Sequence, residues 1–425
     1  MCFRRWCKKI NNLSELVGLN VRQTIMQQVL LIILLGIFSL YILLIFYYWQ
    51  SWLSIPNYKP QTTDHKPLTR ISVIIPARNE EENIAACLDS INAQSYPKEL
   101  FEVLVVDDHS TDNTAAVIKT YSEQHVKLIS LKDFLDESEL NSYKKKAIEI
   151  AIGQSTGELI VTTDADCIVP VNWLQTIAAF YAQYQPEFIV MSVGIRHANS
   201  IRQNSPCGEF LQIFQSLDFM TLQGITGASV HKKTHSMCNG ANLAYTKKAF
   251  EEVGGFTGID HIASGDDMML MHKIYKRYPD QVMFLKSKEV IVQTQPAKSV
   301  KEFFNQRIRW ASKADQYDDK RIFVVLLLVY LINLILLLLP MLLIFNAEIL
   351  SIFNYQLSIF DLWILLLLIK TSVELLFLYP VANFFGKQKM LWLFPLMQPF
   401  HIIYTVMAGW LGKFGSYSWK ERNVK

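Results

Sequence analysis

The sequence lacks the patterns that mark several common classes of protein. Its six cysteines form no CxxC pair and have no zinc-site spacing, so we expect reduced, mostly buried thiols in a cytosolic domain. It contains neither GxGxxG nor GxxxxGK[ST], so neither an ordinary dinucleotide fold nor a P-loop is predicted. The net charge is only +3, and nothing predicts binding to nucleic acid. Internal repeats and low-complexity tracts are also missing.

Long apolar runs predict an integral membrane protein with a water-soluble part. Apolar residues make up 51% of the chain, the mean hydropathy is +0.18, and the excess lies in a few runs. After a polar, basic segment over 1–28, residues 29–49 are uncharged and long enough to span a bilayer as a helix. A cleaved signal peptide is less favoured, because the run is long and aromatic and no small-residue cleavage site follows it. Residues 50–69 are typical of a linker.

Three further apolar segments lie near the C-terminus. We expect residues 322–345 and 360–381 to be transmembrane helices. The second carries Lys370 and Glu374, whose i, i+4 spacing allows an ion pair within the membrane. Residues 391–411 contain two prolines and a histidine, and both a transmembrane and an interfacial helix remain open for them.

Residues 70–295 alternate short apolar runs with amphipathic stretches, the pattern of an α/β domain. Within it, residues 157–167 read GELIVTTDADC, a buried strand that ends in Asp164 and Asp166. The β-α-β-α-β order, with right-handed crossovers, predicts a mostly parallel, doubly wound sheet that binds a nucleotide. The other expected strands are 70–76, 101–106, 126–131, 188–195 and 290–294, and the expected helices include 80–94, 142–152 and 209–222.

Asp164 and Asp166 form a candidate metal site at the carboxyl edge of this sheet. Ligands of open α/β sheets bind at that edge, and two carboxylates so close together favour a cation between them. Hard oxygen ligands suit Mg²⁺ or Mn²⁺, which are usually shared with substrate phosphates. The alternative is a solvated acidic turn, which an isolated DxD would favour.

Several motifs in order make residues 70–312 resemble the family 2 glycosyltransferases, inverting membrane enzymes with a GT-A domain. The segment IPARNE over 75–80 is similar to the family's nucleotide-holding strand and loop, and VDDHS over 106–110 to the strand end whose aspartate accepts from the base. The alternative for this aspartate pair is helix capping, and for the lysine triplet at 144–146 a solvated face. By the resemblance, the donor-binding residues are Pro76, Arg78, Asn79, Glu80, Asp107, Asp108, Lys144 and Asp164.

The same resemblance implies which residues are catalytic. Asp164-Ala-Asp166 matches the metal-binding DxD of the family, with Mg²⁺ or Mn²⁺ as the cofactor. Asp266 and Asp267 match its acidic pair, whose second member is the general base. The family more often has Glu-Asp at this pair, which leaves the role of Asp266 open.

The segment 296–320 contains a second catalytic motif. Residues 299–310, SVKEFFNQRIRW, are amphipathic and basic and predict a helix at the membrane surface. Gln306, Arg309 and Trp310 match the family's QxxRW, in which the arginine gives a permanent positive charge for the leaving diphosphate. The tryptophan offers a flat face to an acceptor sugar, and an interfacial anchor is its alternative role.

The resemblance implies an α/β GT-A domain flanked by transmembrane helices. The expected enzyme is an inverting hexosyl- or N-acetylhexosaminyltransferase that moves sugar from a nucleotide-diphosphate donor, foremost a UDP-sugar, to a lipid-linked or glycan acceptor. Such chemistry belongs to cell-envelope polysaccharide or glycolipid synthesis. Within this class, QxxRW favours a processive polysaccharide synthase, whereas the small number of spans favours transfer of one sugar or a few.

Two alternatives come from other classes of protein. A catalytically idle membrane protein that only binds nucleotide sugars is disfavoured, because DxD, the acidic pair and QxxRW are all intact. A nucleotidyltransferase also uses a Rossmann-like sheet and Mg²⁺, but it would be expected to carry a glycine-rich loop after the first strand. Residues 76–80 contain no glycine.

The distribution of Lys and Arg gives conflicting predictions for the orientation in the membrane. Lys387 and Lys389 predict a cytosolic turn, and the basic tail over 412–425 favours an interfacial helix before it. The basic residues of 1–28, however, should stay cytosolic and send the catalytic domain outside, where no nucleotide donor is present. We therefore hypothesise that translation starts at Met26, which gives a multi-pass cell-membrane protein with a cytosolic catalytic domain. N-terminal sequencing of the natively expressed protein would contradict this by finding the preceding residues.

Overall fold

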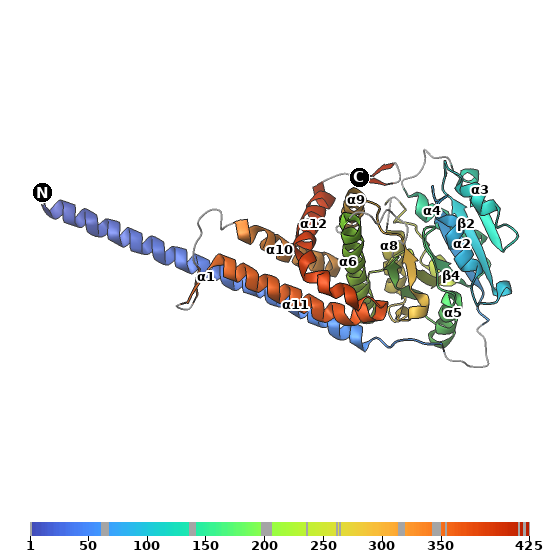
Figure 1. Cartoon of the computed structure of the whole chain (residues 1–425), viewed down its shortest axis with the longest axis horizontal. Coiled ribbons are helices and arrows are strands. Elements are labelled where there is room, and N and C mark those ends of the chain that lie inside the picture. Colours follow the sequence, from blue (N-terminus) through green and yellow to red (C-terminus); the bar gives the residue numbers. More distant parts are fainter. Residues whose placement is uncertain are drawn as a thin grey trace.

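The computed structural model has a sheet domain within residues 68–296 and a helical region beside it (Figure 1). The helical region comprises α1 (Cys2–Ser54), α10 (Lys320–Leu338), α11 (Ile359–Phe385) and α12 (Phe394–Phe414). Residues 342–349 and 353–354, between α10 and α11, and residues 415–416, 420–421 and 425 of the basic tail lie outside the described residues. The structure describes residues 2–60, 68–135, 142–196, 206–234, 237–260, 262, 265–312, 319–341, 350–352, 355–414, 417–419 and 422–424.

Seven strands form the central sheet, in the order β3-β2-β1-β4-β7-β5-β8. Neighbouring strands are parallel except around β7, which runs antiparallel to both β4 and β5. Apolar side chains are buried on both faces of β1, as expected of a parallel sheet covered on both sides. The predicted α/β class with a mostly parallel sheet is therefore confirmed. The strands are β1 (Ile71–Ala77), β2 (Phe101–Asp107), β3 (Val126–Ser130), β4 (Leu159–Thr162), β5 (Phe188–Met191), β7 (Leu243–Thr246) and β8 (Val282–Leu285).

The segment predicted as one strand over 188–195 is two strands in separate sheets, so that prediction was wrong. After β5, β6 (Val193–Ile195) pairs in parallel with β9 (Val292–Thr294) in a small sheet of its own. The carbonyl of Ser192, between them, accepts from the Asn242 side chain at 2.7 Å and from the backbone N–H of Val292 at 3.2 Å. These bonds redirect the chain at Ser192, although its apolar pattern continues through the break.

Helices cover both faces of the sheet. One face packs against α2 (Ile84–Asn92) and α5 (Trp173–Tyr184). The other packs against α4 (Tyr143–Gln154), and its apolar cluster continues to Trp52 and Phe377 in the helical region. The sheet domain and the helical region therefore share one hydrophobic core. The remaining helices of this part of the chain are α3 (Thr114–Lys119), α6 (Pro206–His231), α7 (Lys247–Glu252), α8 (Asp266–Arg277) and α9 (Val300–Ala311).

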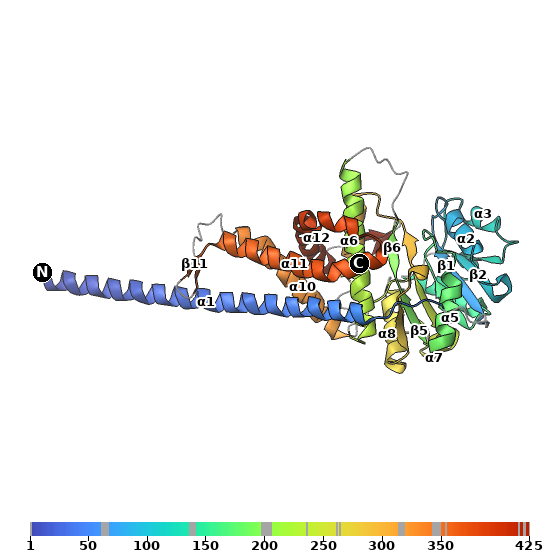
Figure 2. The same ribbon diagram turned by 60° about the horizontal axis from the view of Figure 1, so that its bottom comes forward.

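Within the described residues, four helical segments are long and apolar enough to cross a membrane. Of these, α1 and α11 run side by side (Figures 1 and 2). The expected ion pair is present in α11, where Lys370 Nζ lies 2.8 Å from Glu374 Oε1. Gln398 of α12 accepts from Lys370 at 2.8 Å and donates to Glu374 at 2.6 Å, so the polar groups satisfy one another inside the bundle. The four segments are Ile25–Ser54, Lys320–Met341, Ile359–Phe385 and Gln388–Phe414.

The helix α12 lies across α1 and α11 instead of alongside them (Figures 1 and 2). Its first half contacts α11 through Gln398, and its last turn lies against α9. A Cβ atom added to Gly412 would be 2.7 Å from the Cβ of Ala311, so glycine permits this close approach. Both ends of α12 are thus near the sheet-domain end of the helical region.

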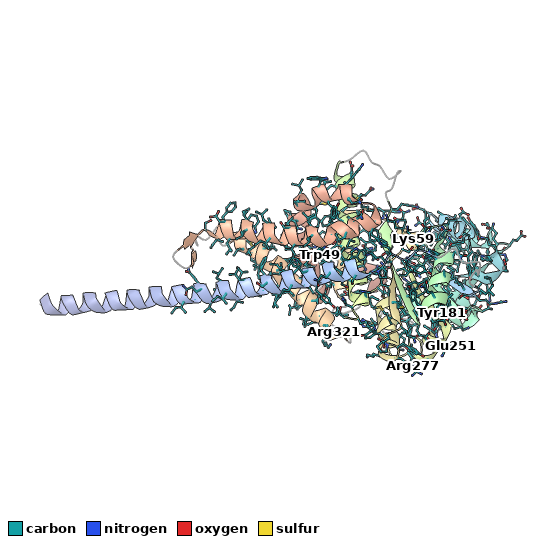
Figure 3. The ribbon with its side chains drawn as sticks, turned by 90° about the horizontal axis from the view of Figure 1, so that it is seen from below. Trp49, Lys59, Tyr181, Glu251, Arg277 and Arg321 are labelled. Carbon is teal, nitrogen blue, oxygen red and sulfur yellow. The ribbon has the colours of Figure 1, made fainter. Side chains whose placement is uncertain are left out.

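Polar contacts fasten the helical region to the sheet domain. Lys286, which follows β8, donates to the carbonyls of Trp52 at 2.8 Å and Ile55 at 3.2 Å. Lys387, which follows α11, donates to the carbonyl of Ile195 at 2.8 Å and to Ser216 of α6 at 2.7 Å. Figure 3 labels Trp49, near the end of α1, and Arg321, at the beginning of α10.

Candidate active site

All but one of the candidate site residues line a single cavity of about 2130 Å³. The cavity begins at the carboxyl ends of β1 and β4, passes the beginning of α8 and the face of α9, and extends between the helices of the helical region. The exception is Asp107, which is buried; its Oδ1 atom has no hydrogen-bond partner within the described part of the chain. The candidate residues that line the cavity are Pro76, Arg78, Asn79, Glu80, Asp108, Lys144, Asp164, Asp166, Asp266, Asp267, Gln306, Arg309 and Trp310.

The loops that follow β1 and β2 are bonded to each other at the first end of the cavity. Arg78 donates through Nη1 to the backbone carbonyl of Asp108 at 3.0 Å. Asn79 has a positive φ of 51°, a conformation that asparagine tolerates better than most residues. Its side-chain oxygen accepts from the backbone N–H of Thr111 at 2.9 Å, and its own N–H donates to Ser110 at 3.0 Å. The candidate nucleotide loops are therefore fixed by local bonds.

Asp164 and Asp166 follow β4, next to these loops, because β1 lies between β2 and β4 in the sheet. Lys144 of α4 donates to Asp164 Oδ1 at 2.7 Å and lies 3.4 Å from Asp266 Oδ2. Burial lowers the pKa of Lys144, but these two carboxylates raise it more, and the net direction is upward. The ammonium group is therefore a fixed positive charge between the two acidic segments.

Asp166 carries the second carboxylate of the candidate metal site. Its Oδ2 accepts from the hydroxyl of Thr294, at the end of β9, at 3.1 Å. Burial, with Asp164 and Glu80 close by, raises the pKa of Asp166 to about 6. A positive charge placed near Asp166 would counter this shift and favour the ionised carboxylate.

The donor set fits a divalent cation that is shared with a ligand. Among the described residues there is no group of three or more His, Cys, Asp or Glu side chains that could hold a metal ion. Two carboxylates are nevertheless the usual protein share of a Mg²⁺ site, whose other ligands are phosphate oxygens and water. Asp164 and Asp166 therefore suit Mg²⁺ or Mn²⁺ when a diphosphate is present.

The acidic pair begins α8, on the side of Lys144 away from the nucleotide loops. Gly265 is the N-cap of this helix, with φ of 82°, and Asp266 and Asp267 are its first two residues. Asp267 accepts through Oδ2 from the backbone N–H of Gly240 at 3.1 Å and through Oδ1 from that of Met268 at 2.7 Å. A Cβ atom at Gly240 would lie 3.1 Å from Asp266 Oδ2, so glycine allows the loop to approach the carboxylates.

The QxxRW segment lies on α9, which begins where the sequence predicts. Ser299 caps the helix and accepts from the backbone N–H of Glu302 at 3.2 Å. Gln306, Arg309 and Trp310 are half-buried and line the cavity. The ring of Trp310 lies 6.1 Å from that of Phe219 in α6, measured between centroids, so one face of the indole is packed against the protein.

Several residues that shape the site were missed by the sequence analysis. Thr294 and Gly240 contact the carboxylates, as described above. Asp218 of α6 binds Arg307, the second residue of the QRIRW segment, and Tyr404 of α12 donates to Asp218. In the sequence, Asp218 is only an aspartate within a largely apolar predicted helix. Nothing in that pattern identifies Arg307 as its partner.

Comparisons with known proteins agree with the motifs. Residues 72–254 match the family model described as glycosyl transferase family 2. Glycosyltransferase AglE of Haloferax volcanii is 26% identical over 239 residues, which cover 56% of this chain and 71% of AglE. The poly(ribitol-phosphate) beta-N-acetylglucosaminyltransferase TarS of Staphylococcus aureus is 32% identical over 127 residues, which cover 30% of this chain but only 21% of TarS.

Among the solved structures to which this chain is similar is the mannosyltransferase PcManGT from Pyrobaculum calidifontis, in complex with GDP-Man and Mn²⁺. The match has 18% sequence identity, covers 88% of this chain and 95% of that one, and has a TM-score of 0.47.

Proposed function

Through residues 72–254 the chain belongs to glycosyl transferase family 2, and we propose that it is an inverting glycosyltransferase at the cytosolic face of a membrane. It takes a hexose or N-acetylhexosamine from a nucleotide-diphosphate sugar, for which a UDP-sugar is the first candidate. The observation that carries the proposal is the single cavity that joins Asp164 and Asp166, Asp267, and Trp310. These groups come from three separate elements, β4, α8 and α9.

The donor would lie at the end of the cavity formed by the β1 and β2 loops and the end of β4. Asp108 lines this end of the cavity and would accept an N–H of the base, whereas Asp107 is buried outside the cavity. Asp164 and Asp166 would hold Mg²⁺ or Mn²⁺, which when bound neutralises charge on the diphosphate. Lys144 and Arg309 would place further positive charge beside the leaving group.

Asp267 is the proposed general base. Two backbone N–H groups hold its carboxylate in place, and it lines the same cavity as Asp164 and Trp310. Direct displacement at the sugar carbon requires one base for the acceptor hydroxyl and no covalent intermediate. Asp267 would accept that proton while the acceptor oxygen attacks and the nucleoside diphosphate leaves.

The acceptor would reach the site from the side of the helical region. The cavity continues past Gln306 and Trp310 and is lined there by side chains of α1, α10, α11 and α12. This continuity supports an acceptor that is lipid-linked or is a glycan held at the membrane. The small number of candidate spans favours transfer of one sugar or a few, whereas a processive synthase is the alternative within the family.

The proposal is tested with membranes that contain the chain and a panel of labelled nucleotide sugars. We expect one label to move into a lipid- or glycan-extractable product, and its size separates single transfer from polymerisation. Membranes with the Asp166→Ala variant are the control and should move none. Binding of a nucleotide sugar by the wild-type chain without transfer of any label would contradict the proposal and favour an idle receptor.

A further inference from the structure

A buried ion pair joins three helices next to the QxxRW segment, and its residues also line the cavity. Arg307 of α9 donates to Asp218 Oδ2 of α6, through Nε at 3.0 Å and through Nη2 at 2.5 Å. The hydroxyl of Tyr404, on α12, donates to the other carboxylate oxygen, Oδ1. The side chains of Arg307 and Asp218 are only 5% and 4% exposed. Both oxygens of Asp218 are therefore used, each by a different helix.

The rest of the Arg307 guanidinium contacts side chains of the QxxRW motif. Its Nη1 atom donates to Gln306 Oε1 at 2.9 Å. The central carbon of its guanidinium lies 4.2 Å from the ring centroid of Trp310 and 4.6 Å from that of Phe303. A planar guanidinium can thus stack on aromatic rings while its edge makes directed hydrogen bonds.

A buried ion pair is by itself weak support for a functional role, because many such pairs only fasten helices together. This pair differs in what it touches. Arg307 contacts two of the three QxxRW side chains, and both of them line the cavity. Asp218 holds one edge of the guanidinium toward α6, since Nε and Nη2 both donate to its Oδ2.

We infer that Asp218 is a positioning residue for the acceptor end of the site. It orients Arg307, which in turn sets the side-chain positions of Gln306 and Trp310, and Tyr404 makes this orientation depend on α12. The inference rests on the proposed function, because it concerns how well an acceptor is held. It goes beyond that function by extending the site to α6 and α12.

The test measures sugar transfer by purified Asp218→Asn and Tyr404→Phe variants in detergent. The donor is the nucleotide sugar selected by the panel, and an organic-solvent extract of native membranes supplies the acceptor. We expect Asp218→Asn to lower transfer about 10- to 100-fold, as small misplacements in a site do, and to raise the amount of extract needed for half-maximal rate. Tyr404→Phe should lie between it and wild type. Binding of the matching nucleoside diphosphate should stay within about two-fold, because Asp218 lies on the acceptor side.

The matched control is Lys286→Met, which removes another buried cation that joins a membrane helix to the sheet domain, away from α9. We expect it to lower thermal stability but to leave transfer per folded molecule unchanged. The inference is overturned if folded Asp218→Asn and Tyr404→Phe both transfer sugar within about two-fold of wild type. It is also overturned if transfer and nucleotide binding fall together in them, in proportion to lost stability. Transfer by the wild-type chain tests the proposed function separately.

Discussion

At the scale of single residues, Asp267 connects two segments that are distant in sequence. An aspartate at the beginning of a helix is often only its cap, but Gly265 is the N-cap of α8 and Asp267 is the second helical residue. Its carboxylate is nevertheless bonded to two backbone N–H groups, one from its own helix and one from Gly240. A purely structural role and a role as the base therefore predict different effects of the same substitution.

The first prediction concerns Asp267→Asn. Loss of a helix-terminal contact costs about 1 kcal/mol of stability, and asparagine replaces it almost without loss. Loss of a general base costs roughly 10²–10⁴-fold in rate, and asparagine cannot take the proton. We expect a folded variant that binds the nucleoside diphosphate normally and transfers almost no sugar. A turnover within a few-fold of wild type would leave only the structural role and direct the search for the base to Asp266.

A second prediction separates the two roles of Trp310. If the exposed part of its ring stacks on an acceptor sugar, Trp310→Ala should cut turnover while nucleotide binding stays nearly intact, and Trp310→Phe should retain part of the turnover. If the indole is only an anchor, both variants should change membrane extraction and expression more than rate. Turnover, nucleotide binding and extraction yield are measured on the same preparations.

Residue types and spacing predicted the motif residues that line the cavity, because each motif is local in sequence. The ion pair next to them could not be predicted in this way. Asp218 and Arg307 are 89 positions apart, and Asp218 and Tyr404 are 186 apart. Only the packing of α6, α9 and α12 brings them together, and no local pattern indicates it.

At the scale of elements, the effect of replacing a glycine by alanine depends on the surroundings of that glycine, as two positions show. A Cβ at Gly240 would lie 3.1 Å from Asp266 Oδ2 and 3.4 Å from Lys144 Nζ, whereas one at Gly153 in α4 would meet nothing within 4 Å. The loop at Gly240 must therefore shift to accommodate a side chain. The helix α4 can accommodate one at Gly153 without any shift.

The third prediction follows from this pair. Gly240→Ala should lower transfer about tenfold, because it displaces the acidic pair. Gly153→Ala should leave transfer unchanged and raise the free energy of unfolding by about 0.5–1 kcal/mol, as expected for a helix position. Transfer assays and chemical denaturation measure the two effects. Equal transfer by both variants would contradict the close approach at Gly240.

The strands predicted from the sequence agree best with the structure where a strand is long and fully buried. The first two strands, around 70–76 and 101–106, are continuous apolar runs and appear as β1 and β2. The sequence analysis did not identify β7 and β8, each of four residues. Runs so short resemble buried pieces of any element, and no motif follows them as the DxD motif follows the equally short β4. The antiparallel insertion of β7 depends on tertiary pairing and not on local preference.

At the scale of the whole molecule, the direction of α12 bears on the proposed arrangement of the chain in a membrane. This helix lies across α1 and α11 (Figure 2), and its last turn lies against α9. An interfacial α12 would place the segment after it on the same side as the sheet domain, together with Lys387 and Lys389. That arrangement agrees with the bias of basic residues toward the cytosol.

The fourth prediction is a labelling experiment on this topology. Single cysteines at Lys389→Cys, Lys413→Cys and Ser358→Cys are treated with a membrane-impermeant maleimide in vesicles of either orientation, with the wild-type chain as background. We expect the first two to react from the side of the sheet domain and the third from the opposite side. Reaction of Lys413→Cys together with Ser358→Cys would show instead that α12 spans the membrane.

The most direct test of the central claim is the metal dependence of sugar transfer by the purified chain. Asp164 and Asp166 alone are a poor site for a hard cation, so the metal should bind mainly with the donor diphosphate. We predict that chelator abolishes transfer, that Mg²⁺ or Mn²⁺ restores it, and that Asp166→Ala lowers the rate by several orders of magnitude at any metal concentration. Full transfer by the wild-type chain in excess chelator would contradict the account.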